Sequence, residues 1–595
     1  MMKINTIRWE AIAAKRVRFS ILVPVLFLLA CRSEDQSRSH VQPVSPQWQK
    51  LGPGGGGSTY APTFSYATPD HFLVRCDMTG SYLTSDGGDS YSQINFPNGT
   101  SSFAYDPLNA NIIYVGSAVL NKSIDGGKTW LRLFPKQEDV LAETFRSDHA
   151  DFSIQTRDSA LYNAKRGRIR NIRVDPVNAS SLYFSMGKYF YHSADSGKTW
   201  RWTRLDEKID LIYTNAINLK QHVLILTPNS VYTFNKSTVN VQRKKLPSQM
   251  APAFSFTAGT IKNSNEVILY ALHYDTRRPV QDEFGYSELW ISRDLGEHWQ
   301  RMEDSIITNR AAGILPSYSM VSCAEFDAEH AYVVTNRYEE KKDTGTVYWY
   351  GALKTSDAGK SWNWVWKGGG GSGRYGVKDG VGVSNLKDAW VEEAFGGEYI
   401  RLLDVGIYPK DGNVAVVTDW YRTMKTTDGG RNWTEIYSKA QPDSTFTSRG
   451  MDVTTSYGVH FDPFDSSHIA ISYTDIGYHH SFNGGKSWRR SVAGVPVTWR
   501  NTCYWVVFDP AVRDKLWSAW SSLHDFPRGK MTLNPAWKKN GRGGICVSTD
   551  GGKTWKKILF ESEKSGCIDL VMDPADPNIL YASMWNRIRK RWRDP

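Results

Sequence analysis

The stretch Ser548-Thr-Asp-Gly-Gly-Lys-Thr-Trp555 decides the fold of this 595-residue chain, because close copies of it recur along the sequence. Each copy reads Ser or Thr, any residue, Asp, any residue, Gly, two further residues and an aromatic ring. In such a turn the carboxylate accepts hydrogen bonds from nearby backbone amides, the glycine takes a left-handed conformation and the ring anchors the turn. These aspartates are therefore predicted to be structural, neither metal ligands nor catalytic acids. The other copies span residues 84–91, 123–130, 193–200, 292–299, 355–362 and 426–433, and an eighth at 481–488 carries Asn483 in place of the aspartate.

This pattern resembles the Asp-box (BNR) repeat of sialidases, sortilin-like receptors and several glycoside hydrolases, which implies a β-propeller. A second unit precedes several boxes: an apolar strand ending in Asp-Pro, a polar turn and another apolar strand, as in residues 103–115 and 459–473. Together the two units make four short antiparallel strands. One interval, residues 222–232, has a strand-turn-strand pattern without a box of its own. The sequence thus predicts an all-β fold with Asp-box turns.

The length of the chain predicts more than one ring. About eleven blades of about 50 residues would follow Trp48, which is too many for one ordinary propeller. Similar glycine runs at residues 54–57 and 368–371 suggest a duplicated opening. We therefore expect two tandem seven-bladed β-propellers, at residues 48–362 and 363–595. The second is expected to be incomplete, since the sequence stops after two strands of a new unit.

The first residues resemble a bacterial lipoprotein signal. Basic residues precede a short apolar run at residues 21–29, and a small residue, Ala30, stands before Cys31. We expect residues 1–31 to be the signal peptide, with Cys31 as the lipidated residue, and residues 32–47 to be a flexible tether. A plain secretory signal, or a buried helix of an unprocessed protein, is the alternative. The expected location is the bacterial cell envelope, anchored to the outer membrane on its periplasmic or surface side.

Neither the cysteines nor the charge point to a metal, a cofactor or a nucleic acid. The other five cysteines lack paired spacing, so no disulfide framework and no zinc site are predicted. The net charge of +11 comes from scattered Lys and Arg, many of them inside the boxes, which does not favour nucleic-acid binding. We expect a monomer that needs no metal and no cofactor.

Two acids depart from the repeat. Asp77 and Asp419 each lie nine residues before the aspartate of the following box, where the second strand of a blade runs into its turn. At the same offset other blades carry Gly116 and Met186, which do not ionise. Turns of an antiparallel blade alternate between its two sides, so these acids are expected opposite the boxes, where propellers bind ligands. The alternative is that each acid caps its own turn.

Motifs around these acids resemble the xyloglucanase family of endo-β-glucanases, glycoside hydrolase family 74. The glycines at 54–57 and Arg75-Cys-Asp-Met-Thr-Gly-Ser-Tyr82 are similar to that family's glycine run and Arg-Thr-Asp-Ile-Gly-Gly-Ala-Tyr motif. The series that opens the family's second propeller resembles Glu392-Glu393, Leu403-Asp-Val405 and Val417-Thr-Asp-Trp-Tyr-Arg422. The resemblance spans most of residues 48–490.

This resemblance implies an inverting, endo-acting hydrolase in which Asp77 is the general base and Asp419 the general acid, in a cleft between two propellers. Inversion needs two carboxyls about 6.5 to 9.5 Å apart, one ionised and one protonated. Met78-Thr79 and Trp420-Tyr421 make both loops bulkier than in the family. Asp475, which an Ile-Gly pair follows, is closer to the family's Asp-Ile-Gly and competes with Asp419 for the acid role. The expected substrate is a plant-type or other complex polysaccharide.

Aromatic and polar residues on the same predicted side are expected to bind sugar. The polar insert at residues 521–530 should overhang the site, and its His524, Asp525 and Arg528 are either substrate ligands or solvated loop residues. The other predicted binding residues are Trp420, Tyr421, Arg422, Tyr478, Trp499, Tyr504, Trp520 and Trp585.

Two other functions stay open. A polysaccharide lyase acting on an acidic glycan would use Tyr478, His479 or His480 as its base, with Arg422 or Arg374 neutralising a uronate. A non-catalytic propeller, sortilin-like or glycan-binding, would need no pair of acids. In each case the expected partner is a polysaccharide or oligosaccharide, and the membrane is reached only through the lipid anchor.

Overall fold

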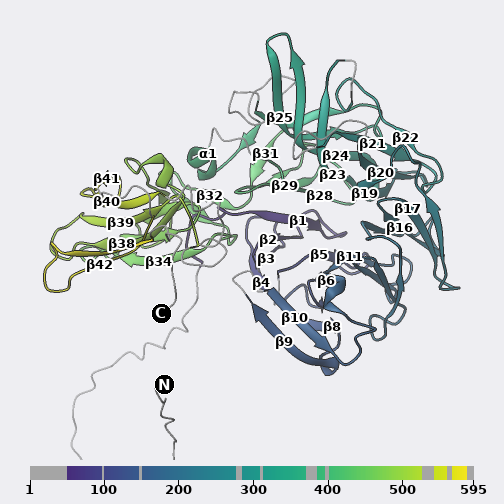
Figure 1. Ribbon diagram of the computed structural model, residues 1–595, viewed down its shortest axis with the longest axis horizontal. Coiled ribbons are helices and arrows are strands. Elements are labelled where there is room, and N and C mark those ends of the chain that lie inside the picture. Colours follow the sequence, from purple (N-terminus) through teal and green to yellow (C-terminus); the bar gives the residue numbers. More distant parts are fainter. Residues whose placement is uncertain are drawn as a thin grey trace, which may run out of the picture. The chain divides into compact units, whose positions relative to one another are not determined.

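Figure 1 shows the computed structural model of the chain, which describes residues 50–78, 80–96, 99–146, 151–275, 285–308, 312–369, 385–395, 401–525, 542–558 and 566–585. Cys31 and the expected signal peptide and tether lie outside these residues. Most of the regular structure is β-strand, and the α-helix α1 (Trp390–Phe395) is short. Within the described ranges, no helix is long and apolar enough to cross a membrane.

Four-stranded antiparallel sheets repeat along the chain, each made of strands that follow one another in sequence. The first six sheets are β1 (Thr59–Phe64), β2 (Phe72–Cys76), β3 (Gly80–Thr84) and β4 (Ser92–Asn95); β5 (Ser102–Tyr105), β6 (Ile113–Gly116), β7 (Leu120–Ser123) and β8 (Leu131–Phe134); β11 (Ile169–Val174), β12 (Leu182–Met186), β13 (Tyr189–Ser193) and β14 (Arg201–Arg204); β15 (Leu211–Tyr213), β16 (His222–Thr227), β17 (Ser230–Asn235) and β18 (Val241–Lys245); β19 (Ala253–Thr260), β20 (Val267–Tyr274), β21 (Ser287–Ser292) and β22 (Gln300–Arg301); β23 (Leu315–Ala324), β24 (Asp327–Lys342), β25 (Gly345–Thr355) and β26 (Asn363–Gly369).

The later sheets follow the same plan, with one parallel addition. In the seventh, β31 also pairs in parallel with β27 (Leu386–Lys387). Its antiparallel strands are β28 (Asp404–Ile407), β29 (Ala415–Thr418), β30 (Thr423–Thr426) and β31 (Trp433–Glu435); two further sheets are β34 (Ser456–Phe461), β35 (Ile469–Tyr473), β36 (Gly477–Ser481) and β37 (Arg489–Arg490), and β38 (Thr502–Phe508), β39 (Leu516–Ser521), β40 (Gly543–Ser548) and β41 (Lys556–Lys557). Two-stranded pairs are β9 (Val140–Arg146) with β10 (Asp151–Thr156), β32 (Ser438–Ala440) with β33 (Phe446–Ser448), and β42 (Gly566–Met572) with β43 (Leu580–Trp585).

The all-β prediction is therefore confirmed, together with the four strands per unit. The interval without a box, residues 222–232, forms β16 and the start of β17 in a complete sheet. Short 3-10 turns η1 (Gln137–Asp139), η2 (Ala164–Arg166) and η3 (Val497–Trp499) connect some of the strands.

Each box forms one hydrogen-bonded turn between the third and fourth strands of a sheet. At Asp357 the Thr355 hydroxyl donates to Oδ1 at 2.8 Å, and Ser361 donates its amide to Oδ1 at 2.9 Å and its hydroxyl to Oδ2 at 2.6 Å. The indole of Trp362 donates to the carbonyl of Gly359 at 3.2 Å. Asn483 makes the equivalent bonds through its amide. The structural role predicted for the box aspartates is thus observed in their contacts.

The box turn packs against the turn between the first two strands of its own sheet. Glycines inside three boxes show this: Gly126 donates to the carbonyl of Asn111 at 3.0 Å, and Gly429 donates to that of Asn413 at 2.9 Å. These two kinds of turn therefore lie on one side of each sheet. The turn between the second and third strands lies at the opposite ends of the strands, and Asp77 and Asp419 both follow a second strand.

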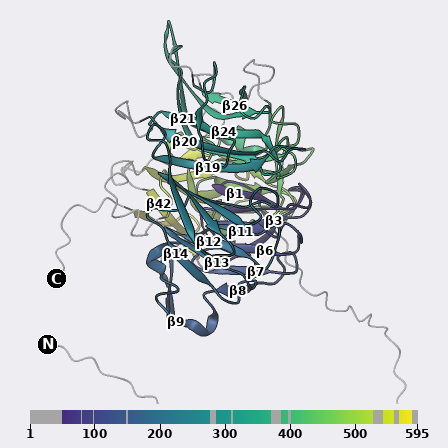
Figure 2. The same cartoon turned by 90° about the vertical axis from the view of Figure 1, so that its right-hand side faces the viewer.

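The first strands of seven sheets contact one another in series. The order is β1, β5, β11, β15, β19, β23 and β28, and β28 contacts β1 again; β1, β11 and β19 can be followed in Figure 2. This sequence of contacts returns to its start, as in a seven-bladed propeller. A second series runs from β34 to β38 and from β38 to β42.

These contacts bear on the expected boundary between residues 362 and 363. The sheet β28–β31 follows that boundary, yet β28 contacts β23 and β1, which both precede it. A boundary after β31 agrees better with the contacts. Lys50–Pro595 form one compact unit, and the division of the chain into residues 48–362 and 363–595 stays a prediction.

The first glycine run is a packed segment that joins the two ends of this series. Gly54 and Gly55 have φ of +79° and +72°, and a Cβ on either would come within 2.4 Å of Tyr437. The indole of Trp390, in α1, donates to the carbonyl of Gly54 at 3.0 Å. Only glycine lets the backbone approach this closely in these conformations.

The turn geometry predicts how a box aspartate responds to substitution. Asp357→Ala removes the acceptor of three hydrogen bonds and should lower the free energy of unfolding by about 1–2 kcal/mol. Asp357→Asn reproduces the chemistry of Asn483 and should cost less than half of that. Urea denaturation of both variants measures the difference. Equal losses in the two variants would contradict the role assigned to the side-chain oxygen.

Candidate functional site

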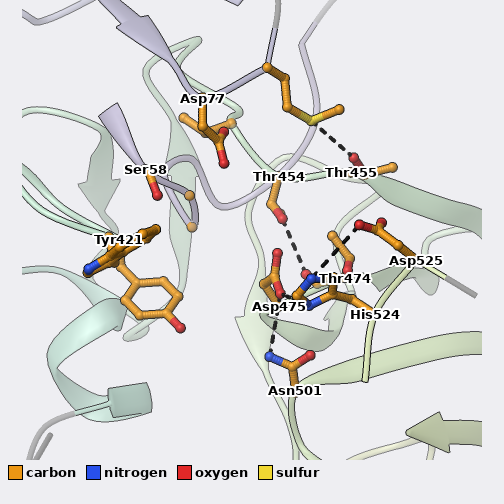
Figure 3. Close-up of a pocket in the computed structure, with 15 residues that line it drawn as sticks. Ser58, Asp77, Tyr421, Thr454, Thr455, Thr474, Asp475, Asn501, His524 and Asp525 are labelled. Carbon is orange, nitrogen blue, oxygen red and sulfur yellow. Dashed lines mark hydrogen bonds and ion pairs between the residues drawn. The ribbon is translucent and has the colours of Figure 1, made fainter. Parts of the chain in front are cut away.

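A pocket of about 330 Å³ lies where turns from several sheets meet (Figure 3). The turn after β2 supplies Asp77, and the turn after β35 supplies Asp475. In Figure 3 Asp77 is at the top, while Asp475 is grouped with His524 and Asp525 at the lower right. The described lining consists of Gly56, Gly57, Ser58, Asp77, Met78, Trp420, Tyr421, Val453, Thr454, Thr455, Thr474, Asp475, Asn501, His524 and Asp525. The pocket thus brings together two of the three predicted catalytic acids.

Asp77 is exposed at the end of β2, while Cys76 beside it is buried. Alternation along a strand accounts for the difference, since successive side chains point to opposite faces. Burial raises the pKa of the Cys76 thiol to about 11, so the thiol stays protonated near neutral pH. The chemistry available at this end of the strand is therefore that of the Asp77 carboxyl.

Asp475 sits in a tight turn between β35 and β36. It has φ of +57°, and Gly477 after it has φ of +75°. Few side chains other than those of Asn and Asp accept this conformation readily. Its Oδ1 lies 2.9 Å from Nδ1 of His524 and 3.4 Å from the donating amide of Asn501. The Asp475 side chain is 32% exposed, so it is fixed by partners and still accessible from the pocket.

Two tyrosines anchor the segment that carries His524. The hydroxyl of Tyr504 donates to the carbonyl of Leu523 at 3.0 Å, and that of Tyr457 accepts from the amide of Asp525 at 3.0 Å. The two phenol rings stack with centroids 4.7 Å apart. His524 is therefore held between two anchored neighbours, and its Nε2 lies 3.8 Å from the Asp525 carboxylate.

An aromatic turn forms another wall of the pocket. Trp420 is 49% exposed, although indole rings usually lie inside proteins. The turn that carries Trp420 and Tyr421 is held by the carboxylate of Asp419, which accepts the amide of Tyr421 at 2.7 Å and that of Arg422 at 2.6 Å. An exposed ring on a fixed turn can stack on the apolar face of a sugar.

Asp419 itself is buried and is not among the described lining residues. Its carboxylate lies 3.4 Å from the guanidinium of Arg422, which also pairs with Asp388. Tyr437 donates its hydroxyl to the same Asp388. Burial raises the pKa of Asp419 to about 6, against the opposing effect of Arg422 and the two amides. The observed contacts are those of an acid that caps its own turn.

Most of the other predicted binding residues lie in the core. Tyr478, Trp499 and Trp520 pack in one buried cluster with Trp555, and Tyr504 is buried on Tyr457. Arg422 is buried between its two carboxylates. The Trp585 side chain lies outside the described part of the chain, as do Arg528, Arg374 and the side chains of Glu392 and Glu393.

The sequence did not single out several residues of the lining. Ser58, Thr454, Thr455 and Asn501 are small polar residues in loops, and no motif or spacing marks them. Asn501 directly precedes β38, one residue before the strand begins, which is the position in its sheet where a ligand-facing loop ends. Only the spatial neighbourhood of Asp475 identifies it.

Comparison with known proteins supports the fold. The family model of the BNR/Asp-box repeat matches residues 547–557. A crystal structure of an ancestral enzyme of glycoside hydrolase family 74 is similar with a TM-score of 0.56 at 15% identity, over 92% of this chain and 76% of that chain. An enzyme of the same family from Niastella koreensis has a TM-score of 0.45 at 14% identity, over 85% and 79%. A xyloglucanase of the family from Xanthomonas campestris has 0.46 at 13%, over 91% and 87%.

The first of these likenesses shows the fold, and with the Asp-box match it confirms the expected resemblance to the tandem-propeller architecture of family 74. No curated protein matches the sequence closely enough to serve as a relative.

The contacts of Asp419 predict a structural effect of its substitution. Asp419→Ala leaves two amides without their acceptor and one buried guanidinium with a single carboxylate, so we expect a loss of about 3 kcal/mol in unfolding free energy. Asp419→Asn keeps an oxygen for the amides and should cost less. Urea denaturation at pH 7 measures both.

The raised pKa also predicts how stability depends on pH. An unfolded Asp ionises near pH 3.9, whereas folded Asp419 keeps its proton to about pH 6. Its contribution is therefore fully present below about pH 4 and is lost as the pH rises through 6. Between pH 4 and 7 the wild type should lose more stability than Asp419→Asn, and parallel curves would refute this.

Proposed function

We propose that this chain is a glycoside hydrolase that cleaves a neutral polysaccharide within its backbone, with Asp77 and Asp475 as the pair of catalytic carboxyls. One observation carries the proposal: acids from corresponding turns of two different sheets line the same pocket. Asp419, the first choice from the sequence, lies outside the described lining, and Asp475 takes its place.

Hydrolysis divides between the two acids. Asp77 accepts a proton from a water molecule, which attacks the anomeric carbon, while the Asp475 side gives a proton to the departing glycosidic oxygen. This reaction inverts the configuration if the two carboxyls lie about 6.5 to 9.5 Å apart, which leaves room for the water. Inversion is part of the proposal and is checked by product stereochemistry.

The charge of the lining favours a neutral substrate. Three carboxyls, those of Asp77, Asp475 and Asp525, face the pocket, and within its described lining His524 is the one basic side chain. A uronate would be repelled by such a surface. Arg422, which a lyase would use to neutralise it, is buried between Asp388 and Asp419.

The lyase also lacks support from its expected base. Tyr478, His479 and His480 are all buried in β36. Burial lowers the pKa of His479 well below its ordinary value, and it lowers that of His480 to about 3, so both rings are neutral but have no access to the pocket. A non-catalytic glycan-binding propeller remains the second candidate, because the exposed Trp420 would serve binding alone.

The likeness to a family 74 enzyme supports the proposal at the level of the fold, and the motifs around Asp77 and Asp475 support it at the level of residues. The proposal includes attachment to the bacterial envelope through a lipid on Cys31. Mass spectrometry of the mature protein would detect the diacylglyceryl group, and an unmodified N-terminus after cleavage elsewhere would contradict the anchor.

The acid pair predicts a specific pattern of activity loss. Asp77→Asn and Asp475→Asn should each lower kcat on soluble neutral β-glucans by at least about 1000-fold, because each removes one proton-transfer group. Asp419→Asn should retain kcat within about tenfold, since the Asp419 carboxyl only supports a turn. Reducing-end release from a panel of glycans measures all three.

Asp357→Asn serves as the matched control, because it changes an acid on the opposite side of a sheet. Full activity of the Asp77 or the Asp475 variant would overturn the site. Glycan binding by the wild type without any bond cleavage would favour the binding module, and unsaturated uronate products would favour the lyase. Proton NMR of the first products reports whether configuration inverts.

Trp420 predicts a separate effect on binding. Trp420→Ala should raise KM by about tenfold, since one stacking contact with a sugar is worth about 1–2 kcal/mol. The ring is half-exposed, so the unfolding free energy should stay within about 0.5 kcal/mol of the wild type. Trp420→Phe should recover part of the affinity. A variant with wild-type KM would remove Trp420 from the proposed substrate site.

A further inference from the structure

We propose that His524 is the positioning residue that supplies the proton carried by Asp475, so that the two side chains act as one acid. The inference rests on the proposed function and deepens it. It assigns to the polar insert a role in the reaction, where the sequence left a choice between substrate contact and a solvated loop.

The geometry of the pair carries the inference. Nδ1 of His524 lies 2.9 Å from Oδ1 of Asp475, which is hydrogen-bonding distance, and the contact is drawn in Figure 3. The two residues come from different sheets, since Asp475 follows β35 and His524 follows β39. A contact between such distant segments requires both turns to be held in place.

Both segments are held. Asp475 and Asp525 each have φ of +57°, a conformation that persists only where surrounding contacts support it. On the His524 side those contacts are the bonds of Tyr504 to Leu523 and of Asp525 to Tyr457. The imidazole is thus directed at Asp475 by backbone anchors on both sides of it.

An imidazole beside the acid changes the pH range in which a proton is available. A free aspartic acid is ionised above about pH 4, whereas imidazole ordinarily keeps its proton to about pH 6.5. Because one hydrogen bond links the two groups, the pair retains a proton until the imidazole loses it. This is the range in which a hydrolase working near neutral pH needs an acid.

The groups that face His524 reinforce this effect. Asp475 is on one side of the ring, and Asp525, at 3.8 Å, is on the other. Asp77 lines the same pocket from the β2 turn, Tyr457 from β34 is neutral near pH 7, and no Lys or Arg occurs in the described lining. Negative neighbours favour the protonated ring, so its proton should be held above pH 6.5.

The proton balance of the step is closed. As the bond between the anomeric carbon and the glycosidic oxygen breaks, the oxygen takes the proton from Asp475, and His524 passes its own proton to the carboxylate. The neutral imidazole then regains a proton from solvent. The water that attacks the carbon gives its proton to Asp77.

The test compares the pH profiles of kcat/KM for the wild type, His524→Gln and His524→Ala. Loss of the ring should shift the high-pH limb down by about two pH units and lower kcat/KM at pH 7 by about 100-fold, with near wild-type values at pH 4.5. Glutamine can keep a hydrogen bond to Asp475 but cannot titrate, so it should not restore the limb. His298→Gln is the control, since His298 pairs with Asp294 at 2.7 Å in a box turn.

An unchanged limb in both His524 variants, or its recovery in His524→Gln, would overturn the inference while leaving the acid pair intact. A second readout does not depend on activity. In histidine-labelled protein the NMR signal absent from His524→Gln should titrate above pH 6.5 in the wild type and lower in Asp475→Asn. No shift between these two proteins would also overturn the inference, whereas failure of the wild type to cleave any glycan would overturn the proposed function alone.

Discussion

The contact between β1 and β28 is the constraint on which the rest of the arrangement depends. A Cβ on Gly406 of β28 would lie 2.0 Å from the carbonyl oxygen of Pro62 in β1, so only glycine permits this approach. Asp404 at the start of β28 accepts the amide of Ala61 at 2.8 Å. Through these contacts the seventh sheet lies beside the first, and residues far apart in sequence share one neighbourhood.

That neighbourhood explains why the pocket forms where it does. The turn after β2 and the turn after β29 belong to adjacent sheets, so Asp77 and the Trp420 turn line one hollow. The glycine run crosses between them, with Gly55 donating to the carbonyl of Met451 at 2.6 Å. The segment after Met451 then leads into β34 and the sheet that supplies Asp475. Boxes on the other side of the sheets hold the strands, which leaves the pocket side free to vary.

Much of the fold could be predicted from the sequence because its signals are local. A box needs only eight consecutive residues, and the offset of Asp77 from its box places it at a strand end without knowledge of any other sheet. The choice between Asp419 and Asp475 was not local. Both acids follow a second strand, but Arg422 and Asp388 draw Asp419 into the core, and a partner from β39 meets Asp475 in the pocket.

The aromatic residues show the same limit in another way. Trp420 and Trp520 look alike in sequence, each at the end of an apolar run, yet one is half-exposed and the other is buried. Burial depends on what the neighbouring sheet presents, which no pattern within one blade contains. Asn501 was missed for this reason too, since its contact with Asp475 crosses from one sheet to the next.

The position of the glycine run has a practical consequence for handling the protein. Gly56, Gly57 and Ser58 line the pocket, and Lys50, a few residues earlier, donates to the carbonyl of Tyr91. A shortened protein that starts at β1 would therefore lose a wall of the pocket while keeping every strand. Purification tags fused close to residue 50 would lie next to that wall, so a cleavable tag placed farther upstream, or one at the other terminus, is the safer choice for assays.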